Sequence, residues 1–275
     1  MSFVNSILRN LVDLGLMPFR SLPPLVGVAV VSLPFAILAL LVYKRFSNQQ
    51  AIERVKNQMA ASFFEIRLFN DDLRSILAAQ RSLLRNNLRY MGLNLKPLAV
   101  MLVPMFLLFA QLQFHYGYQG LEIGKPAVLS LRLSAEAATA GRPEVALAAP
   151  AGIRIDSPAI WAPARQELAW RLVGESSGSY ELAIDLDGRR TTKNVVVSDE
   201  VVRRSPNRLR PGLVNQLLYP AEDPIPRGVP VEEMTIAYPD AEVWFFGWRT
   251  HWSIVLLILS IVFAFALRKR FGVTF

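Results

Sequence analysis

The sequence predicts an α-helical membrane protein with an all-β domain inserted between its second and third spans. Two observations lead to this prediction. Hydrophobic residues make up 52% of the 275 residues, more than a typical soluble domain contains, and they concentrate in three charge-free runs. Between the second and third runs, apolar residues alternate along the chain as they do in β-strands.

The three apolar runs are the expected transmembrane helices. A span needs roughly 20 residues, and each run reaches or approaches that length once its flanks are counted. A buried core helix is the alternative interpretation, and the charged or aromatic residues that border each run argue against it. We expect spans at residues 22–43, 97–113 and 251–267.

Positive charge is distributed unevenly between the segments that join the spans. Residues 44–96 carry ten Lys and Arg against four Asp and Glu, whereas residues 114–250 carry fifteen against seventeen. Because short loops rich in Lys and Arg stay in the cytoplasm, we expect residues 44–96 and the basic tail 268–275 to be cytoplasmic. The N-terminus and residues 114–250 are then outside. The charge follows the first run, which we therefore interpret as a retained anchor and not as a cleaved signal.

Residues 1–21 predict an amphipathic helix that lies in the outer membrane–water interface. Apolar residues recur at steps of three and four along one side, and polar residues occupy the other. Gly15 and Pro18 end the pattern, and a flexible tail is the alternative. The apolar side consists of Phe3, Val4, Ile7, Leu8, Leu11 and Leu14, and the polar side of Asn5, Ser6, Arg9, Asn10 and Asp13.

Residues 44–96 predict a cytoplasmic coiled-coil hairpin of two antiparallel helices. The helical pattern breaks at Asn70, a favourable N-cap residue, and it ends at Gly92 and Asn94. One continuous helix is the alternative, but it would carry the chain away from the membrane that it must re-enter. The simpler interpretation of the basic face is a solvated surface near anionic lipid. The more specific one is contact with ribosomal RNA or a nascent chain. That face carries Arg54, Lys56, Arg67, Arg74, Arg81, Arg85 and Arg89.

Residues 114–200 predict an antiparallel β-sandwich of immunoglobulin-like type, outside the membrane. Short alternating stretches occur around Leu131, Trp170 and Ile184, and Asp187-Gly188 is a strong signal for a hairpin turn. Trp170 is the expected core residue. Residues 201–250 are rich in proline and are expected to cross the outer surface in extended form, with one further strand near 231–238. Aromatic residues then form an expected belt at the interface: Trp244, Phe245, Phe246, Trp248 and Trp252.

The sequence carries no signature of covalent or metal chemistry. The absence of cysteine excludes disulfides and thiolate metal sites. His115 and His251 sit at the outer ends of spans, where an interfacial position explains them more simply than a zinc or acid–base role. No glycine-rich phosphate loop follows a strand, and nothing marks a serine as a nucleophile. We therefore expect neither an enzyme nor a bound metal or cofactor.

The order of these parts, with the stretch from Asn87 to Pro97 and Pro104-Met105-Phe106, resembles the core of a known superfamily. This is the Oxa1/YidC/Get1/EMC3/TMCO1 superfamily of membrane protein insertases. The resemblance covers roughly residues 1–113 and 252–275. It implies three spans that frame a groove open to the cytoplasm and the lipid, and a hairpin that receives the inserted protein. Local thinning of the bilayer would lower the cost of moving polar groups through the groove.

The sequence departs from the superfamily pattern at two places. YidC-type members carry an arginine within the first core span, and residues 22–43 hold no charge. The β-domain also lies between the second and third spans, which suggests docking to an external partner or chaperoning of a translocated domain. The groove would then depend on Arg20, Ser32, Gln111, Gln113 and Ser260.

The leading functional hypothesis is a protein of the bacterial inner membrane that assists insertion or folding of membrane proteins. Its expected partners are the lipid bilayer, nascent or client membrane proteins, the ribosome, and an extracytoplasmic protein that binds the β-domain. The alternative is an envelope scaffold or signalling protein whose immunoglobulin-like domain binds an extracytoplasmic partner. A membrane-embedded enzyme is a distant third hypothesis.

Overall fold

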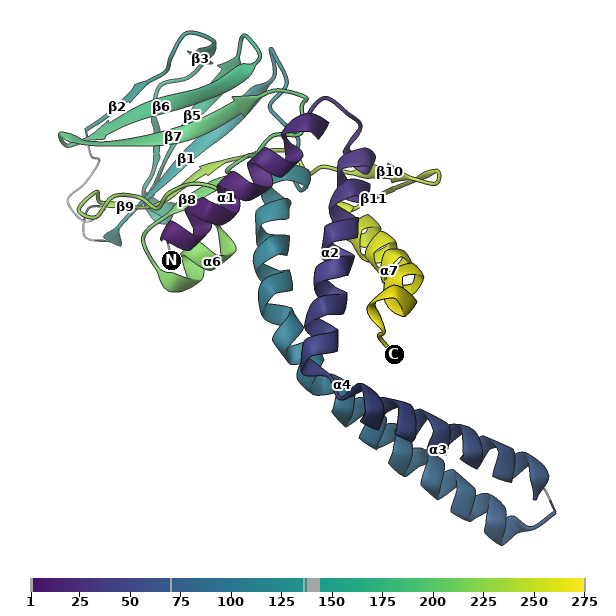
Figure 1. Ribbon diagram of the computed structural model, residues 1–275. Coiled ribbons are helices and arrows are strands. Elements are labelled where there is room, and N and C mark those ends of the chain that lie inside the picture. Colours follow the sequence, from purple (N-terminus) through teal and green to yellow (C-terminus); the bar gives the residue numbers. More distant parts are fainter. Residues whose placement is uncertain (1, 70, 136, 138–143, 275) are drawn as a thin grey trace. The chain divides into compact units, whose positions relative to one another are not determined.

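A computed structural model describes residues 2–69, 71–135, 137 and 144–274 of the chain (Figure 1). The chain forms two compact units. The β unit comprises Met1–Val28 and Leu107–Val255, and the hairpin unit comprises Ala29–Phe106 and Leu256–Phe275. Three of the described helices are long and apolar enough to cross a membrane, so this is a membrane-associated chain. They are α2 (Pro24–Phe46), α4 (Leu73–Tyr116) and α7 (Trp252–Phe271).

Two antiparallel sheets share one hydrophobic core in the β unit. The first sheet has the order β3-β5-β1-β9-β8, with β4 also paired to β5, and the second has the order β2-β6-β7. Trp170 pairs in register with Leu129, and both side chains are buried, as the alternation predicts. The strands are β1 (Pro126–Leu133), β2 (Val145–Ala148), β3 (Ile153–Ile155), β4 (Ile160–Ala162), β5 (Glu167–Gly174), β6 (Gly178–Leu186), β7 (Arg189–Val197), β8 (Asn207–Leu209) and β9 (Val231–Ile236).

The turn between β6 and β7 forms where the sequence predicts it. Asp187 and Gly188 both adopt positive φ, at 51° and 76°, which a two-residue type I′ turn requires. The turn sets the register of β6 on β7, with Leu186 opposite Arg189.

The proline-rich segment is more structured than we expected. We expected residues 201–250 to be extended with one strand, and β9 lies within the range where that strand was expected. The segment also supplies β8, the short helix α6 (Leu213–Leu218), and the hairpin of β10 (Val243–Phe245) and β11 (Trp248–Thr250). Because β9 pairs with β1 and buries Met234 and Ile236 in the shared core, the β-domain extends past residue 200, where we expected it to end.

The N-terminal residues form the expected helix, α1 (Ser2–Leu16), followed by a short 3-10 turn, η1 (Met17–Phe19). Figure 1 shows α1 alongside α6, and the two helices are in contact. This contact is within the β unit, so α1 is attached to the β-domain and is not a free tail.

In the hairpin unit, α3 (Gln49–Leu68) runs back along the first half of α4 (Figure 1). The side chain of Asn48 caps α3 by accepting a hydrogen bond from the Ala51 amide, at 3.0 Å. Asp72 caps α4 in the same way, because its Oδ1 accepts from the Arg74 amide at 3.0 Å. Asn70, which we expected to be the cap, lies outside the described residues.

The helix α4 is continuous, which corrects our expectation of two helices separated near Gly92 and Pro97. It runs from Leu73 to Tyr116 through both Pro97 and Pro104. A proline removes one hydrogen bond from a helix, but a long apolar helix in a membrane tolerates this loss. The Asn94 side chain also donates to the Tyr90 carbonyl at 2.7 Å, so it follows the helix and does not end it. The second helix of the hairpin and the second span are therefore parts of one continuous helix.

Candidate functional site

The interface between α3 and the first half of α4, here called the seam, buries few large apolar side chains. Ile52 and Val55 are buried near its base, but its middle contains the small or polar residues Ser62 and Ala79. The Ser62 hydroxyl donates to the Gln58 carbonyl at 3.1 Å and lies 3.3 Å from the Ser82 hydroxyl across the seam. Small side chains bury little apolar surface, so most of the hairpin's large apolar residues lie elsewhere.

A row of large apolar side chains lies on the surface of α4 instead. Every member of the row is at least half exposed within the structure. The members follow one another at steps of three, four or seven residues, and at about 100° per residue they fall within an arc of about 80°. We call this row the leucine ladder; it consists of Leu73, Leu77, Leu84, Leu88, Met91, Leu95, Leu98 and Leu102.

The leucine ladder connects two different environments. Its first members, Leu73 and Leu77, lie near the start of α4 at the hairpin tip, and Phe63 and Phe64 near the end of α3 are exposed as well. Its last members, Leu98 and Leu102, lie in the apolar half of α4 that is suited to a membrane. Because α4 is unbroken, the row continues from one environment to the other on one face of one helix.

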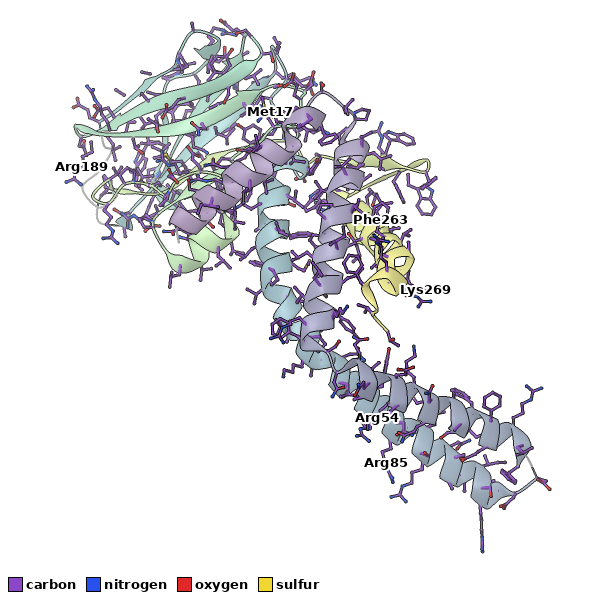
Figure 2. All side chains as sticks on the ribbon, in the orientation of Figure 1. Met17, Arg54, Arg85, Arg189, Phe263 and Lys269 are labelled. Carbon is purple, nitrogen blue, oxygen red and sulfur yellow. The ribbon has the colours of Figure 1, made fainter. Side chains whose placement is uncertain are left out.

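The predicted basic residues lie on the hairpin surface. Lys56 is half-buried and the other six are exposed. Figure 2 shows Arg54 on α3 and Arg85 on α4 pointing away from the helices. On α4, the arginines occupy the helical face next to the leucine ladder, on the side away from the seam. The exposed residues are Arg54, Arg67, Arg74, Arg81, Arg85 and Arg89.

The five residues that we proposed for a groove are divided between the two units. Ser32 and Ser260 are buried in the hairpin unit, whereas Arg20, Gln111 and Gln113 belong to the β unit. Gln113 Oε1 accepts a hydrogen bond from Trp252 Nε1 at 3.0 Å and so ties α4 to α7.

Two of these five residues have buried polar atoms without a partner. Gln111 Oε1 and Ser260 Oγ make no hydrogen bond to any described residue. Such atoms are costly in an apolar environment, which marks both positions as candidates for contact with a polar group.

Arg20, the one charged member of the proposed groove set, lies in the β unit. It is half-buried beside a cavity of about 390 Å³ that Asp13 and Arg203 also line. Its carbonyl accepts a hydrogen bond from the Val201 amide at 3.0 Å. The described contacts of Arg20 are therefore with the β-domain.

A partly buried polar cluster joins α1, α4 and the β-domain, and sequence reasoning missed it. Asp13 Oδ1 lies 2.8 Å from His115 Nε2 and 2.8 Å from an Arg203 guanidinium nitrogen. His115 is almost fully buried, and its Nδ1 lies 3.2 Å from the Gln111 carbonyl. Burial alone would raise the pKa of Asp13, but the hydrogen bond with His115 and the charge of Arg203 outweigh it and lower that pKa.

The two histidines do not share a site. His251 is exposed, and its Nδ1 lies 2.6 Å from the Ser253 hydroxyl. His115 instead contacts Asp13. Within the described ranges, no three His, Asp or Glu side chains come together as metal ligands do. The histidines thus act in separate structural contacts.

Comparisons of this chain with protein-family models, with curated proteins and with solved structures find no match. The functional argument therefore depends on the surfaces described above.

Proposed function

We propose that this chain is an insertase or chaperone for membrane proteins, of the type found in the Oxa1 superfamily. The leucine ladder is the observation that carries the proposal. An apolar side chain gains about 1.5–3 kcal/mol on full burial, so a row of half-exposed leucines favours binding of another apolar surface. A helix is the natural occupant, because it presents apolar residues at the same spacing.

The length of the ladder supports a membrane-bound client as that occupant. From Leu73 to Leu102 the row extends about 44 Å, and a transmembrane helix of 20 residues is about 30 Å long. A client helix would therefore fit on the hairpin and stay in contact with apolar side chains as it moves toward the lipid. Such transfer needs no covalent chemistry, and we propose that the chain is not an enzyme and uses no cofactor.

The proposed setting is the bacterial inner membrane, with the N-terminus outside and the C-terminus in the cytoplasm. The arginines beside the ladder support a cytoplasmic hairpin, because basic segments remain on that side. They would also disfavour clients with positive charge at the ladder and attract anionic lipid or RNA near the surface. The β-domain would be outside, and its two antiparallel sheets around a buried Trp170 support an immunoglobulin-like sandwich.

Depletion followed by an insertion assay tests the proposal. Cells depleted of the chain should fail to insert reporter proteins with one span and a short translocated tail, and the intact chain supplied from a plasmid should restore insertion. A reporter with a long translocated domain, which needs a translocon, serves as the control. Unchanged insertion of the short-tailed reporters would reject the proposal and favour the scaffold or signalling hypothesis.

A further inference from the structure

The helix α1 has its polar side chains directed toward protein. Asn5 donates to the Gln216 carbonyl of α6 at 2.6 Å, and Arg9 forms an ion pair with Asp223 at 2.5 Å. One turn further on, Asp13 binds Arg203 and His115. Asn5, Arg9 and Asp13 are spaced at four residues, so one face of α1 holds all of these contacts.

The apolar side of α1 is directed away from the protein. Ile7, Leu11 and Leu14 are 43%, 60% and 70% exposed. At about 100° per residue, they centre almost opposite Asn5, Arg9 and Asp13. A surface helix in water shows the reverse arrangement, with its apolar face buried and its polar face solvated. An apolar medium or partner would satisfy this face of α1.

The neighbouring helix α6 presents the same kind of surface. Leu213 and Val214 are about as exposed as Leu14, and Leu218 is also exposed. Polar groups of α6 contact the protein: Asn215 donates to the Arg210 carbonyl at 3.1 Å. Both helices thus direct several polar groups toward the domain and expose most of their large apolar side chains, apart from Leu16 and the partly buried Leu8, Val12 and Leu217.

The β10–β11 turn is a third apolar element of the β unit. Phe246 is 90% exposed and Trp248 is 77% exposed. Phe246 and Gly247 adopt φ of 47° and 89°, so a type I′ turn holds the Phe246 ring out from the domain. The Arg249 guanidinium lies 5.7 Å from the centre of the Trp244 ring, within the range of a cation–π contact.

The chain connects each of these elements closely to a span. The turn is followed by α7, which begins at Trp252, two residues after β11 ends. Similarly, α1 and η1 lead into α2, which begins at Pro24. From Phe246 in the turn to Trp252 at the start of α7 the chain has six residues, which reach about 20 Å when fully extended, so the aromatic turn lies within about 20 Å of the start of α7.

We propose that the β-domain binds the bilayer surface directly, through the apolar faces of α1 and α6 and the aromatic β10–β11 turn. The occupant of these faces is the interfacial region of a phospholipid bilayer. Tryptophan and phenylalanine beside a span are typical of that region, and an amphipathic helix lies in it with its apolar side chains among the acyl chains. In this arrangement α1 joins the domain to the lipid, with its polar face on the domain and its apolar face in the membrane. The proposal does not depend on the insertase function.

Spin labelling of the full-length chain tests this proposal, and the absence of native cysteine makes single labels straightforward. Leu11→Cys, Val214→Cys and Phe246→Cys would each carry a nitroxide, and all three sites are exposed. The control is Ala151→Cys, which is also exposed and lies next to β3, at the other end of the domain from α6 in Figure 1. Proteins are reconstituted in vesicles of phosphatidylcholine and phosphatidylglycerol. Power saturation then compares collisions with oxygen, which concentrates in lipid, and with a water-soluble nickel chelate.

The proposal predicts that oxygen relaxes the three test labels more than nickel does, and that the order is reversed for the control label. If nickel relaxes the test labels more than oxygen does, as expected for the control, the surface faces water and the proposal is overturned. Labels protected from both reagents would show that protein covers the surface, for example a second copy, and would overturn it as well. Solubilised in detergent, each variant must give the far-ultraviolet circular dichroism spectrum of the parent chain.

Discussion

Asp13 on α1 and His115 near the end of α4 are joined by a contact of 2.8 Å between Oδ1 and Nε2. The residues are far apart in the sequence, yet both lie within the β unit. The His115 ring faces two acceptors, Asp13 and the Gln111 carbonyl, and the same Asp13 oxygen also meets Arg203. This carboxylate therefore holds α1 against two other segments at once.

Replacement of Asp13 by Asn should loosen α1 from the β-domain. Asn keeps the shape but removes the charge that balances Arg203. Because the Asp13 side chain is 35% exposed, solvent screens the interaction, and we expect a loss of about 1 kcal/mol in the free energy of unfolding. Thermal unfolding in detergent measures the loss, with Asn10→Ala on the exposed side of α1 as the control. An equal effect from both variants would contradict a specific role for Asp13.

The same contact should weaken in acid. The folded protein holds the pKa of Asp13 below its ordinary value of 3.8, because the contacts with His115 and Arg203 outweigh the effect of burial. For a lowered carboxyl pKa, the stabilisation is fully present above the ordinary value and disappears as the pH falls through the folded value. Proteolysis near residue 20 should therefore be slow at neutral pH and should accelerate below about pH 4 in the intact chain, but less so in Asp13→Asn.

Gly27 on α2 allows close packing against Tyr116 of α4. A Cβ atom at residue 27 would collide with the Tyr116 hydroxyl. We expect Gly27→Ala to reduce the free energy of unfolding by about 1–3 kcal/mol, as overpacking usually does. Tyr116→Phe removes the colliding oxygen and should restore most of the loss in the double variant. Gly92→Ala on α4 is the control, because nothing lies within 4 Å of its Cβ and alanine favours a helix. A Gly27→Ala variant as stable as the parent would argue against this packing.

Lys193 and Glu222 form an ion pair inside the β-domain, 2.6 Å apart, with side chains that are 0% and 6% exposed. Burial lowers the pKa of Lys193, and the charge of Glu222 offsets this only in part. Glu222→Gln should cost about 3–5 kcal/mol, because it removes the carboxylate that balances the buried ammonium group and Arg208, and among the described residues the hydrogen bonds to Ser205 are what then remain for Lys193.

A double variant distinguishes the lost pair from general damage. Lys193→Met in the Glu222→Gln background should recover much of the stability, since the buried ammonium group is then gone and Arg208, 3.9 Å from the lost carboxylate, still has backbone carbonyl partners. Glu122→Gln is the control, because its ion pair with Lys125 is exposed on both sides and should contribute little. Denaturant unfolding followed by tryptophan fluorescence compares the parent chain, the single variants Glu222→Gln and Lys193→Met, the double variant and the control. Strictly additive losses would show that the two residues do not act as a pair.

The parts of the fold that depend on local patterns could be predicted from the sequence. The three spans, the strands around Trp170 and the Asp187-Gly188 turn all follow from composition or periodicity within short windows. The short helix α6 could not be predicted in this way, because six residues between prolines carry too little periodicity. The contact of Asp13 with His115 and Arg203 depends on segments that the fold brings together from distant parts of the chain.

The surface of the hairpin shows how a helical pattern can be recognised while the face that packs against α3 stays undetermined. Ile76, Leu77, Leu83 and Leu84 all fit a helical apolar pattern, but they form two sets that lie about 100° apart around the helix. Ile76 and Leu83 are partly buried, whereas Leu77 and Leu84 are exposed members of the ladder. The angle of each residue around the helix axis, which can be calculated from the sequence, separates the two sets. Which set faces α3 depends on the pairing of the helices, and that pairing is not a local property.

The leucine ladder yields the most direct prediction about function. Leu84→Asp with Leu88→Asp should leave the fold intact, because both side chains are more than 60% exposed. If a client helix buries these leucines, the loss of at least about 1.5 kcal/mol from each should weaken binding more than tenfold. Photocrosslinking from the hairpin to a short-tailed reporter should fall accordingly, together with reporter insertion. Asn57→Asp with Ala61→Asp adds the same charges at the same spacing on exposed positions of α3 and should change neither. Normal crosslinking and insertion by the ladder variant would show that the ladder is not the client-binding surface, since the control excludes a general effect of negative charge on the hairpin.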